Sequence, residues 1–217
     1  MTPATGFLQI YAILPRTMTL GPYLRFAIWV QGCPRNCPGC MSPDAKSFDS
    51  GTVINIGTLA DQVLSVPEIE GITVSGGEPF MQARNLSQLM EQIRSVRDLG
   101  LIVYTGFTLE ELQEKIRAGE EEVQKLLDYT DLLIDGPYIR ELDDGLSLRG
   151  SANQKVHEMT ERYKGAAEKY YGKPGRNMEL HLLEDKVFLA GIPGAESLDQ
   201  WQRKKIIIPV PKDEFQT

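Results

Sequence analysis

The sequence predicts an α/β fold built around a parallel sheet. Short β-rich segments alternate along the chain with segments whose apolar residues recur at helical spacing. Glycine-containing turns follow several of the expected strands, and an order of strand, turn and helix is typical of a parallel sheet with helical crossovers. The chain has 217 residues, of which 41% are hydrophobic, so it has the size and apolar content of about one globular domain.

The N-terminal segment predicts two strands, a helix and a third strand. Apolar residues alternate over residues 8–14, and we expect this strand to break at Pro15. A second strand at residues 24–30 leads directly into a loop rich in proline, glycine and cysteine. An amphipathic helix over residues 58–66 and a β-rich strand at residues 71–74 follow.

The middle of the chain repeats this pattern of helix and strand. Thr108 and Glu111 form a capping-box pattern that marks the start of one helix. The expected elements are a helix at residues 86–96, a strand at 101–104, helices at 108–116 and 123–127, and a strand at 132–135.

The composition changes in the last third of the chain. We expect residues 1–154 to form the core and residues 155–217 to form a C-terminal extension, to which the sequence assigns no chemistry. Within the extension, short strands are expected at residues 179–183, 186–190 and 205–210.

Charge and hydropathy exclude several classes of function. The chain has 23 basic and 30 acidic residues, and a net charge of -7 argues against binding to a nucleic-acid backbone. It has no apolar run of about 20 residues that could span a membrane. Residues 1–15 lack the basic start and long apolar core of a signal peptide, so we expect a cytoplasmic protein.

Three cysteines carry the strongest chemical signal. Cys33, Cys37 and Cys40 are an odd number of thiols packed into eight positions, which argues for reduced cysteines rather than a disulfide framework. Thiolates at this spacing can hold three corners of a [4Fe-4S] cluster and leave its fourth iron open. The alternatives are a structural zinc site completed by His157 or His181, and cysteines that only pack in the core.

A second signal lies at the ends of the expected strands. The sequence Ser75-Gly76-Gly77-Glu78-Pro79 follows a strand, and its glycines allow the backbone to approach a small ligand closely. Loops beginning at Tyr104 and at Asp135 also follow strands and should reach the same edge of the sheet. For Asp135, a structural role as a turn or helix cap remains the alternative.

Together these motifs resemble the radical S-adenosylmethionine superfamily, and within it the activating enzymes of glycyl radical enzymes. The resemblance covers about residues 19–154. It rests on Gly32-Cys33, Cys37-Pro38-Gly39-Cys40, Thr73-Val74-Ser75-Gly76-Gly77-Glu78-Pro79-Phe80, Tyr104-Thr105-Gly106-Phe107, Leu133-Ile134-Asp135-Gly136-Pro137 and Arg149-Gly150-Ser151-Ala152-Asn153-Gln154.

The resemblance implies a fold and a set of site residues. The fold would be a partial, open (β/α) barrel with a short C-terminal extension, and the open iron of the cluster would chelate S-adenosylmethionine. Asp135 would lie near a monovalent cation beside this ligand. The residues implied to bind S-adenosylmethionine are Ser75, Gly76, Gly77, Glu78, Pro79, Tyr104, Thr105 and Asp135.

The resemblance also implies an activity and its partners. The cluster would reductively cleave S-adenosylmethionine to a 5′-deoxyadenosyl radical, which would generate a glycyl radical on a partner, anaerobic ribonucleotide reductase. Because the chain has three cysteines in total, the electron should come from an external flavodoxin or ferredoxin. The alternatives are a radical enzyme that acts on another protein, peptide or small molecule, and a non-catalytic iron-sulfur sensor.

Overall fold

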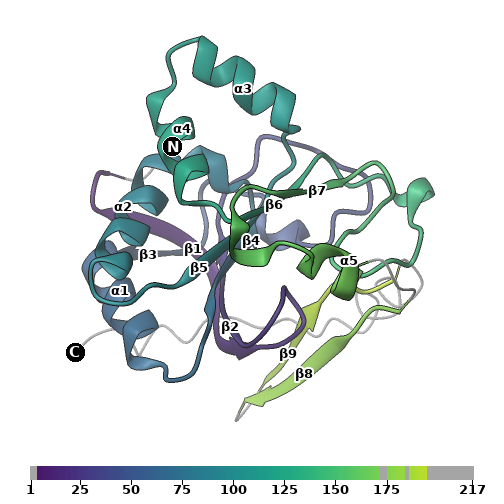
Figure 1. The fold of residues 1–217 in the computed structure, drawn as a ribbon, viewed down its shortest axis with the longest axis horizontal. Coiled ribbons are helices and arrows are strands. Elements are labelled where there is room, and N and C mark those ends of the chain that lie inside the picture. Colours follow the sequence, from purple (N-terminus) through teal and green to yellow (C-terminus); the bar gives the residue numbers. More distant parts are fainter. Residues whose placement is uncertain (1–3, 172–174, 184–185, 195–217) are drawn as a thin grey trace.

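A seven-stranded mixed sheet forms the centre of the protein in the computed structural model, which describes residues 4–171, 175–183 and 186–194 (Figure 1). The strand order is β3-β1-β2-β4-β5-β6-β7. The strands are β1 (Phe7–Thr17), β2 (Arg25–Val30), β3 (Thr52–Asn55), β4 (Gly71–Gly76), β5 (Gly100–Tyr104), β6 (Leu132–Asp135) and β7 (Lys155–Glu158). The four central strands, from β2 to β6 in this order, are parallel, whereas β1, β3 and β7 pair antiparallel.

Five α-helices and a separate hairpin complete the described part of the chain. The helices are α1 (Ile56–Ser65), α2 (Ala83–Arg94), α3 (Leu109–Arg117), α4 (Glu121–Tyr129) and α5 (Ala166–Tyr171), and the hairpin consists of β8 (Met178–Leu183) and β9 (Lys186–Gly191). None of these helices combines the length and the apolar character that crossing a membrane requires.

The structure confirms the predicted alternation of strands and helices, with corrections at particular residues. β1 continues through Pro15 to Thr17, and its pairing with β2 shifts register between Leu14 and Thr17. Proline lacks the N–H that a regular ladder needs, so the strand accommodates it by an irregularity instead of ending. α1 begins at Ile56, two residues earlier than expected, because the Asn55 side chain accepts hydrogen bonds from the first turn.

Two edge strands were not predicted, and one predicted strand cannot be compared. β3 and β7 have four residues each and carry little periodicity of their own; β7 joins the sheet by pairing antiparallel with β6. The hairpin β8–β9 matches the strands expected at residues 179–183 and 186–190. The strand expected at residues 205–210 lies outside the described residues, and the division of the chain at residue 154 stays a prediction.

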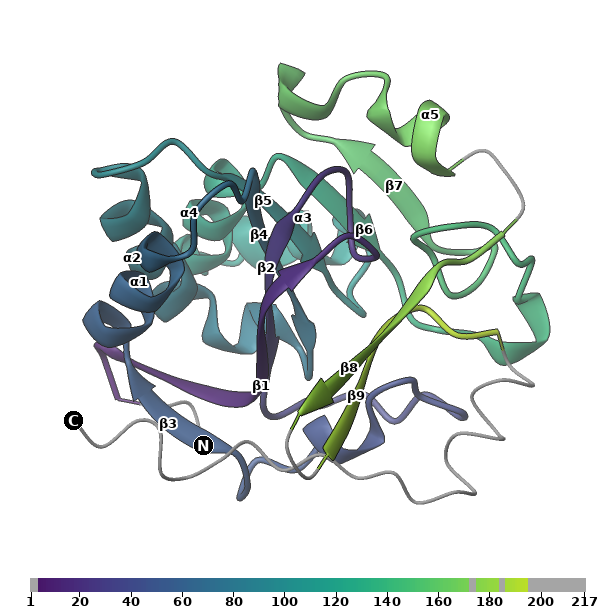
Figure 2. The same cartoon turned by 90° about the horizontal axis from the view of Figure 1, so that it is seen from below.

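The two faces of the sheet differ in what covers them. Helices α1, α2 and α4 pack on one face against side chains that include Ile28, Val74, Val103 and Leu133, each at most 1% exposed. The hairpin β8–β9 lies on the opposite side of the sheet (Figure 2). Because neighbouring residues of a strand point to opposite faces, Trp29, Ser75 and Tyr104 belong to the face without these helices. β3 and β7 form the two edges, so the described sheet is open.

A buried arginine joins the amino ends of the central strands. Arg25 is 0% exposed, and its guanidinium donates to Thr73 Oγ1 at 2.7 Å, Glu70 Oε2 at 2.8 Å and Tyr163 Oη at 2.8 Å. It also donates to the backbone carbonyls of Ile72 and Gly100. A buried charge is tolerated only when it is paired and its donors are satisfied, and this network meets both conditions. It binds the segment after β7 to the end of the sheet where the central strands begin.

We predict that Glu70→Ala lowers the free energy of unfolding by roughly 2 kcal/mol, because it leaves the Arg25 charge buried without its carboxylate. Urea unfolding of the cluster-free chain measures this change. Glu161→Ala is the matched control, since it removes the exposed ion pair with Lys164 and should cost less than about 1 kcal/mol. Equal losses in the two variants would show that the Arg25 network does not stabilise the sheet.

Candidate active site

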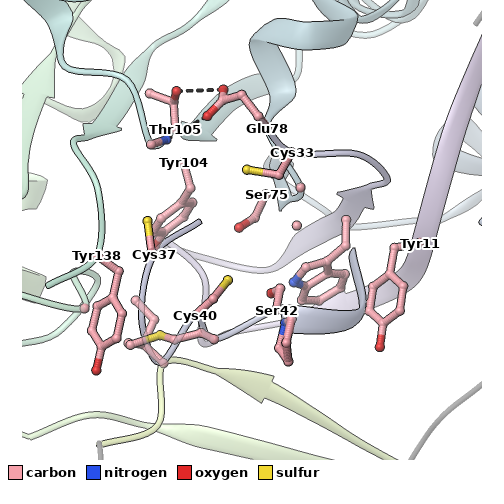
Figure 3. A pocket seen from close by; sticks show the side chains of 18 of the residues that line it. Tyr11, Cys33, Cys37, Cys40, Ser42, Ser75, Glu78, Tyr104, Thr105 and Tyr138 are labelled. Atoms are coloured by element: carbon pink, nitrogen blue, oxygen red, sulfur yellow. Dashed lines mark hydrogen bonds between the residues drawn. The ribbon is translucent and has the colours of Figure 1, made fainter. Parts of the chain in front are cut away.

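The loops that follow β2, β4, β5 and β6 meet at one edge of the sheet. Val30 of β2 lies beside Gly76 of β4, and Val74 lies beside Val103 of β5, so the carboxyl ends of these parallel strands are in step. The loops enclose a cavity of about 510 Å³ (Figure 3). This confirms the expectation that the cysteine loop and the glycine-containing loops open on a common edge, where ligands bind in parallel-sheet proteins.

The cysteine loop begins where β2 ends, and backbone hydrogen bonds hold its first residues. Gly32 N donates to Ala45 O at 2.8 Å and Cys33 N donates to Lys46 O at 3.0 Å, so the far end of the loop folds back on its start. Glu78 N donates to Gly32 O at 2.8 Å, which joins the cysteine loop to the loop after β4. The position of Cys33 is therefore set by backbone contacts on both sides.

All three cysteines line the cavity as free thiols, and their sulfur atoms face a common space (Figure 3). Burial raises the pKa of the Cys33 and Cys40 thiols, so both favour the protonated form in the metal-free chain. Metal ligation requires the thiolate and therefore releases these protons. Within the described ranges, no three His, Cys, Asp or Glu side chains are close enough to hold a single metal ion.

The two histidines named as zinc ligands lie elsewhere. His157 Nε2 is 2.9 Å from Asp135 Oδ2, and His181 Nε2 is 3.0 Å from Glu179 Oε2. Neither histidine is among the residues that line the cavity with the cysteines. The described structure therefore does not bring a histidine to the thiols.

Gly76 and Gly77 allow the loop after β4 to lie directly against the cysteine loop. Gly76 has φ +97°, and a Cβ there would lie 2.7 Å from Val30 O. A Cβ on Gly77 would lie 2.4 Å from Gly32 O. Any side chain at either position would push the two loops apart, so these glycines are needed for the close approach and not only for the turn.

Glu78 joins the loop after β4 to the loop after β5. Its side chain is completely buried; Oε1 accepts from Thr105 Oγ1 at 2.7 Å and from Phe80 N at 3.1 Å, and Oε2 accepts from Gly106 N at 2.8 Å. Burial raises the pKa of Glu78 above its ordinary value, while these hydrogen bonds and the Arg35 charge favour the carboxylate. The carboxylate thus acts on the protein itself, as a connection between two loops of the cavity.

The remaining predicted residues divide into those that reach the cavity and those that do not. Asp135 is not among the lining residues: Oδ2 accepts from Leu109 N at 2.7 Å, at the start of α3, and Oδ1 accepts from Lys155 N at 3.1 Å in β7. Pro79 starts a short 3₁₀ helix, Pro79–Gln82, and is also absent from the lining. The predicted residues that do line it are Cys33, Cys37, Cys40, Ser75, Gly76, Gly77, Glu78, Tyr104 and Thr105.

Other residues of the cavity wall were not predicted. Arg35, inside the cysteine motif, forms an ion pair with Glu111 and lies over the Phe107 ring, with 4.7 Å between the guanidinium carbon and the ring centroid. It thereby attaches the cysteine loop to the start of α3. Trp29 and Phe188 also line the cavity and come from segments far apart in the sequence, so no local pattern could have identified them.

Two tyrosine hydroxyls in the cavity wall lack a partner. The Oη atoms of Tyr104 and Tyr138 are buried, and neither has a hydrogen-bond partner in the described part of the chain. Burial raises the pKa of both groups, so both hydroxyls keep their proton and remain donors. Buried polar groups are nearly always hydrogen-bonded, so two buried hydroxyl donors without a protein partner in the described residues are unusual.

We predict that Glu78→Gln lowers the free energy of unfolding by about 2 kcal/mol, because one of the two carboxyl oxygens becomes an NH2 group that faces a backbone N–H donor, either that of Phe80 or that of Gly106. A carboxyl whose pKa is raised in the folded state stabilises that state most below the ordinary glutamate pKa, and this contribution falls as pH rises through the folded-state value. The loss caused by the variant should therefore shrink with rising pH. Urea unfolding over a pH series checks this, and a loss that grows with pH would contradict it.

Comparisons with known proteins identify the family. A family described as "4Fe-4S single cluster domain" matches residues 19–157. A protein of Vibrio cholerae named anaerobic ribonucleoside-triphosphate reductase-activating protein is 34% identical over 155 residues, which cover 67% of this chain and 95% of that protein. Proteins of the same name from Haemophilus influenzae and Escherichia coli K12 are 33% and 29% identical, and the alignments cover 70% and 67% of this chain and 97% and 95% of theirs. The chain therefore belongs to the 4Fe-4S single cluster domain family, together with these activating proteins.

Proposed function

We propose that this protein is a radical S-adenosylmethionine enzyme that generates a glycyl radical on anaerobic ribonucleotide reductase. The observation that carries the proposal is the meeting of three free cysteines with the Gly-Gly-Glu loop around one cavity, in a chain of an iron-sulfur family. When bound, the cluster would supply one electron that cleaves S-adenosylmethionine to methionine and a 5′-deoxyadenosyl radical, and this radical would take a hydrogen atom from a glycine of the partner.

The three cysteines suit a cluster better than a single ion. Cys33, Cys37 and Cys40 would each hold a different iron of one [4Fe-4S] cube, so they need to surround a space rather than a point. Their sulfur atoms face a common space in the cavity. The chain has no further cysteine, which leaves the fourth iron free for S-adenosylmethionine.

The polar side of the cavity would hold S-adenosylmethionine. Ser75, Gly76 and Gly77 would lie against its amino group, and Glu78 would keep this loop in place through the loop after β5. A monovalent cation at Asp135 stays a prediction. In the structure, the Asp135 carboxylate accepts hydrogen bonds from two backbone N–H groups of the protein.

The open sheet is consistent with a partial (β/α) barrel, because helices cover one face and the cavity lies at the carboxyl ends of the parallel strands. In such an arrangement, loops of different strands contribute to one site while the sheet beneath stays rigid. An external flavodoxin or ferredoxin would provide the electron, because the chain has no cysteines for a second cluster.

The loop of residues 149–154 is our candidate for contact with the glycine-bearing segment of the partner. Gly150 and Gln154 line the cavity, and Gln154 Oε1 accepts from Gly150 N at 2.8 Å. Asn153 Nδ2 donates to Pro137 O at 2.7 Å, which holds the loop against the segment after β6. The partner itself is inferred from the names of the relatives, which are reductase-activating proteins.

We predict that Cys33→Ala, Cys37→Ala and Cys40→Ala each abolish the visible absorbance of the reconstituted cluster, because each variant removes one of only three thiolate ligands. Anaerobic reconstitution with iron and sulfide, followed by absorbance and iron analysis, measures this. Ser65→Ala, on an exposed part of α1, is the control and should leave the iron content unchanged. A wild-type protein that holds stoichiometric zinc and no iron would refute the cluster.

We predict that a glycine-centred doublet appears by electron paramagnetic resonance when the reconstituted protein, a reductant, S-adenosylmethionine and anaerobic ribonucleotide reductase are mixed without oxygen. Asn153→Ala should reduce this signal several-fold more than it reduces the iron content, because it frees the loop that we assign to the partner. If S-adenosylmethionine is cleaved and no glycyl radical forms on the reductase, the partner assignment is wrong, and a different protein, peptide or small molecule is the substrate.

A further inference from the structure

The hairpin β8–β9 forms part of the cavity wall, although it lies beyond residue 157, where the family match ends. It lies on the side of the sheet that α1, α2 and α4 leave uncovered (Figure 2). Phe188, Leu189 and Ile192 from the hairpin and the segment after it line the same cavity as the three cysteines. The close view places this hairpin next to the part of the loop that carries Cys40 and Ser42 (Figure 3).

The hairpin has an inner and an outer face of different character. Ala190 is 0% exposed and packs with Trp29 in one apolar cluster, and the Phe188 ring meets the Trp29 ring edge to face, with 5.0 Å between their centroids. Leu180 and Leu182 are 62% and 80% exposed, so they belong to the outer face. Contacts between the hairpin and the sheet are thus made by one face only.

Arg176 fixes the base of the hairpin to the loop beside the site. Its guanidinium, 7% exposed, pairs with the Asp143 carboxylate through contacts of 2.6 and 3.0 Å. It also donates to the carbonyls of Arg149 and Gly150, both at 3.1 Å, and to Pro193 O at 3.2 Å. One buried charge therefore joins the start of the hairpin, its end and the loop of residues 149–154.

A second anchor holds the hairpin to the end of β1. Glu179 Oε2 accepts from Thr17 Oγ1 at 2.7 Å, and Glu179 Oε1 accepts from Met18 N at 2.8 Å. Charge-assisted hydrogen bonds of this kind are stronger than neutral ones. The hairpin is therefore attached at its base by Arg176, beside β1 by Glu179 and over Trp29 by Phe188.

We infer that residues 176–183 and 186–193 act as a fixed wall that restricts access to the three cysteines, with Phe188 as the residue that keeps bulky molecules out. This inference rests on the proposed function, which supplies the reason for such a wall. A site that forms a radical must exclude solvent and unwanted hydrogen donors. With this side closed, the partner's glycine segment would enter along the loop of residues 149–154, as a narrow, extended peptide.

Thiol labelling tests the wall directly, because the three cysteines are the only thiols in the chain. The full-length protein before cluster insertion is treated with iodoacetamide, a small reagent, and with a polyethylene-glycol maleimide, a bulky one. Phe188→Ala should raise the ratio of the maleimide labelling rate to the iodoacetamide labelling rate about fivefold. A fivefold change corresponds to ~1 kcal/mol, which is the energy of one edge-to-face aromatic contact such as that between Phe188 and Trp29. Arg176→Gln should raise this ratio at least as much.

Leu182→Ala is the matched control, because it removes an apolar side chain from the outer face of the same hairpin and should leave the ratio unchanged. Ratios in Phe188→Ala and Arg176→Gln that stay at the Leu182→Ala value would overturn the inference. Phe188 contacts Trp29, whereas Arg176 contacts the loop of residues 149–154. If thermal unfolding shows that one of these variants does not fold, the labelling ratio of the other variant tests the wall.

A second measurement separates the wall from the proposed function. On reconstituted full-length protein, iron release to the bulky chelator bathophenanthroline disulfonate should be faster in Phe188→Ala than in Leu182→Ala, and equal release rates would contradict the wall. If no cluster assembles in the wild type, the proposed function fails, whereas the labelling ratios still support or overturn the wall.

Discussion

The buried carboxylate of Glu78 is the connection on which the site depends. It accepts hydrogen bonds from Thr105 and Gly106 in the loop after β5, and its own backbone N–H donates to Gly32 at the start of the cysteine loop. Three loops from three parallel strands therefore meet at one residue. A buried carboxylate is costly unless it is hydrogen-bonded, and the three hydrogen bonds that Glu78 accepts offset this cost only while the loops keep this arrangement.

Charged side chains stabilise both ends of the sheet, but they have different roles at the two ends. At the amino ends of the strands, Arg25 and Glu70 belong to a network whose contacts are with the protein itself, so we regard it as a device for stability. At the carboxyl ends, Glu78 and Arg35 position the loops around the cavity. This arrangement fits a division between a rigid base and a ligand-binding edge.

The sequence predicts the central strands and much of the site because both depend on local patterns. The spacing of the cysteines, and Gly76 and Gly77 at the end of β4, identify functional segments from only a few neighbouring residues. Residues such as Phe188 could not be predicted, because their role depends on a hairpin packing against a distant strand. The edge strand β7 was missed for the same reason: four residues carry too weak a period, and pairing with β6 stabilises them.

In the function that we propose, three thiolates and the loop after β4 build a site for reductive cleavage of S-adenosylmethionine. The most direct test is to reconstitute the wild-type protein anaerobically with iron and sulfide, reduce it, add S-adenosylmethionine and measure 5′-deoxyadenosine and methionine. We predict that both products form in equal amounts and only after reduction. A protein that assembles the cluster and binds S-adenosylmethionine, yet yields no 5′-deoxyadenosine when reduced, would contradict it.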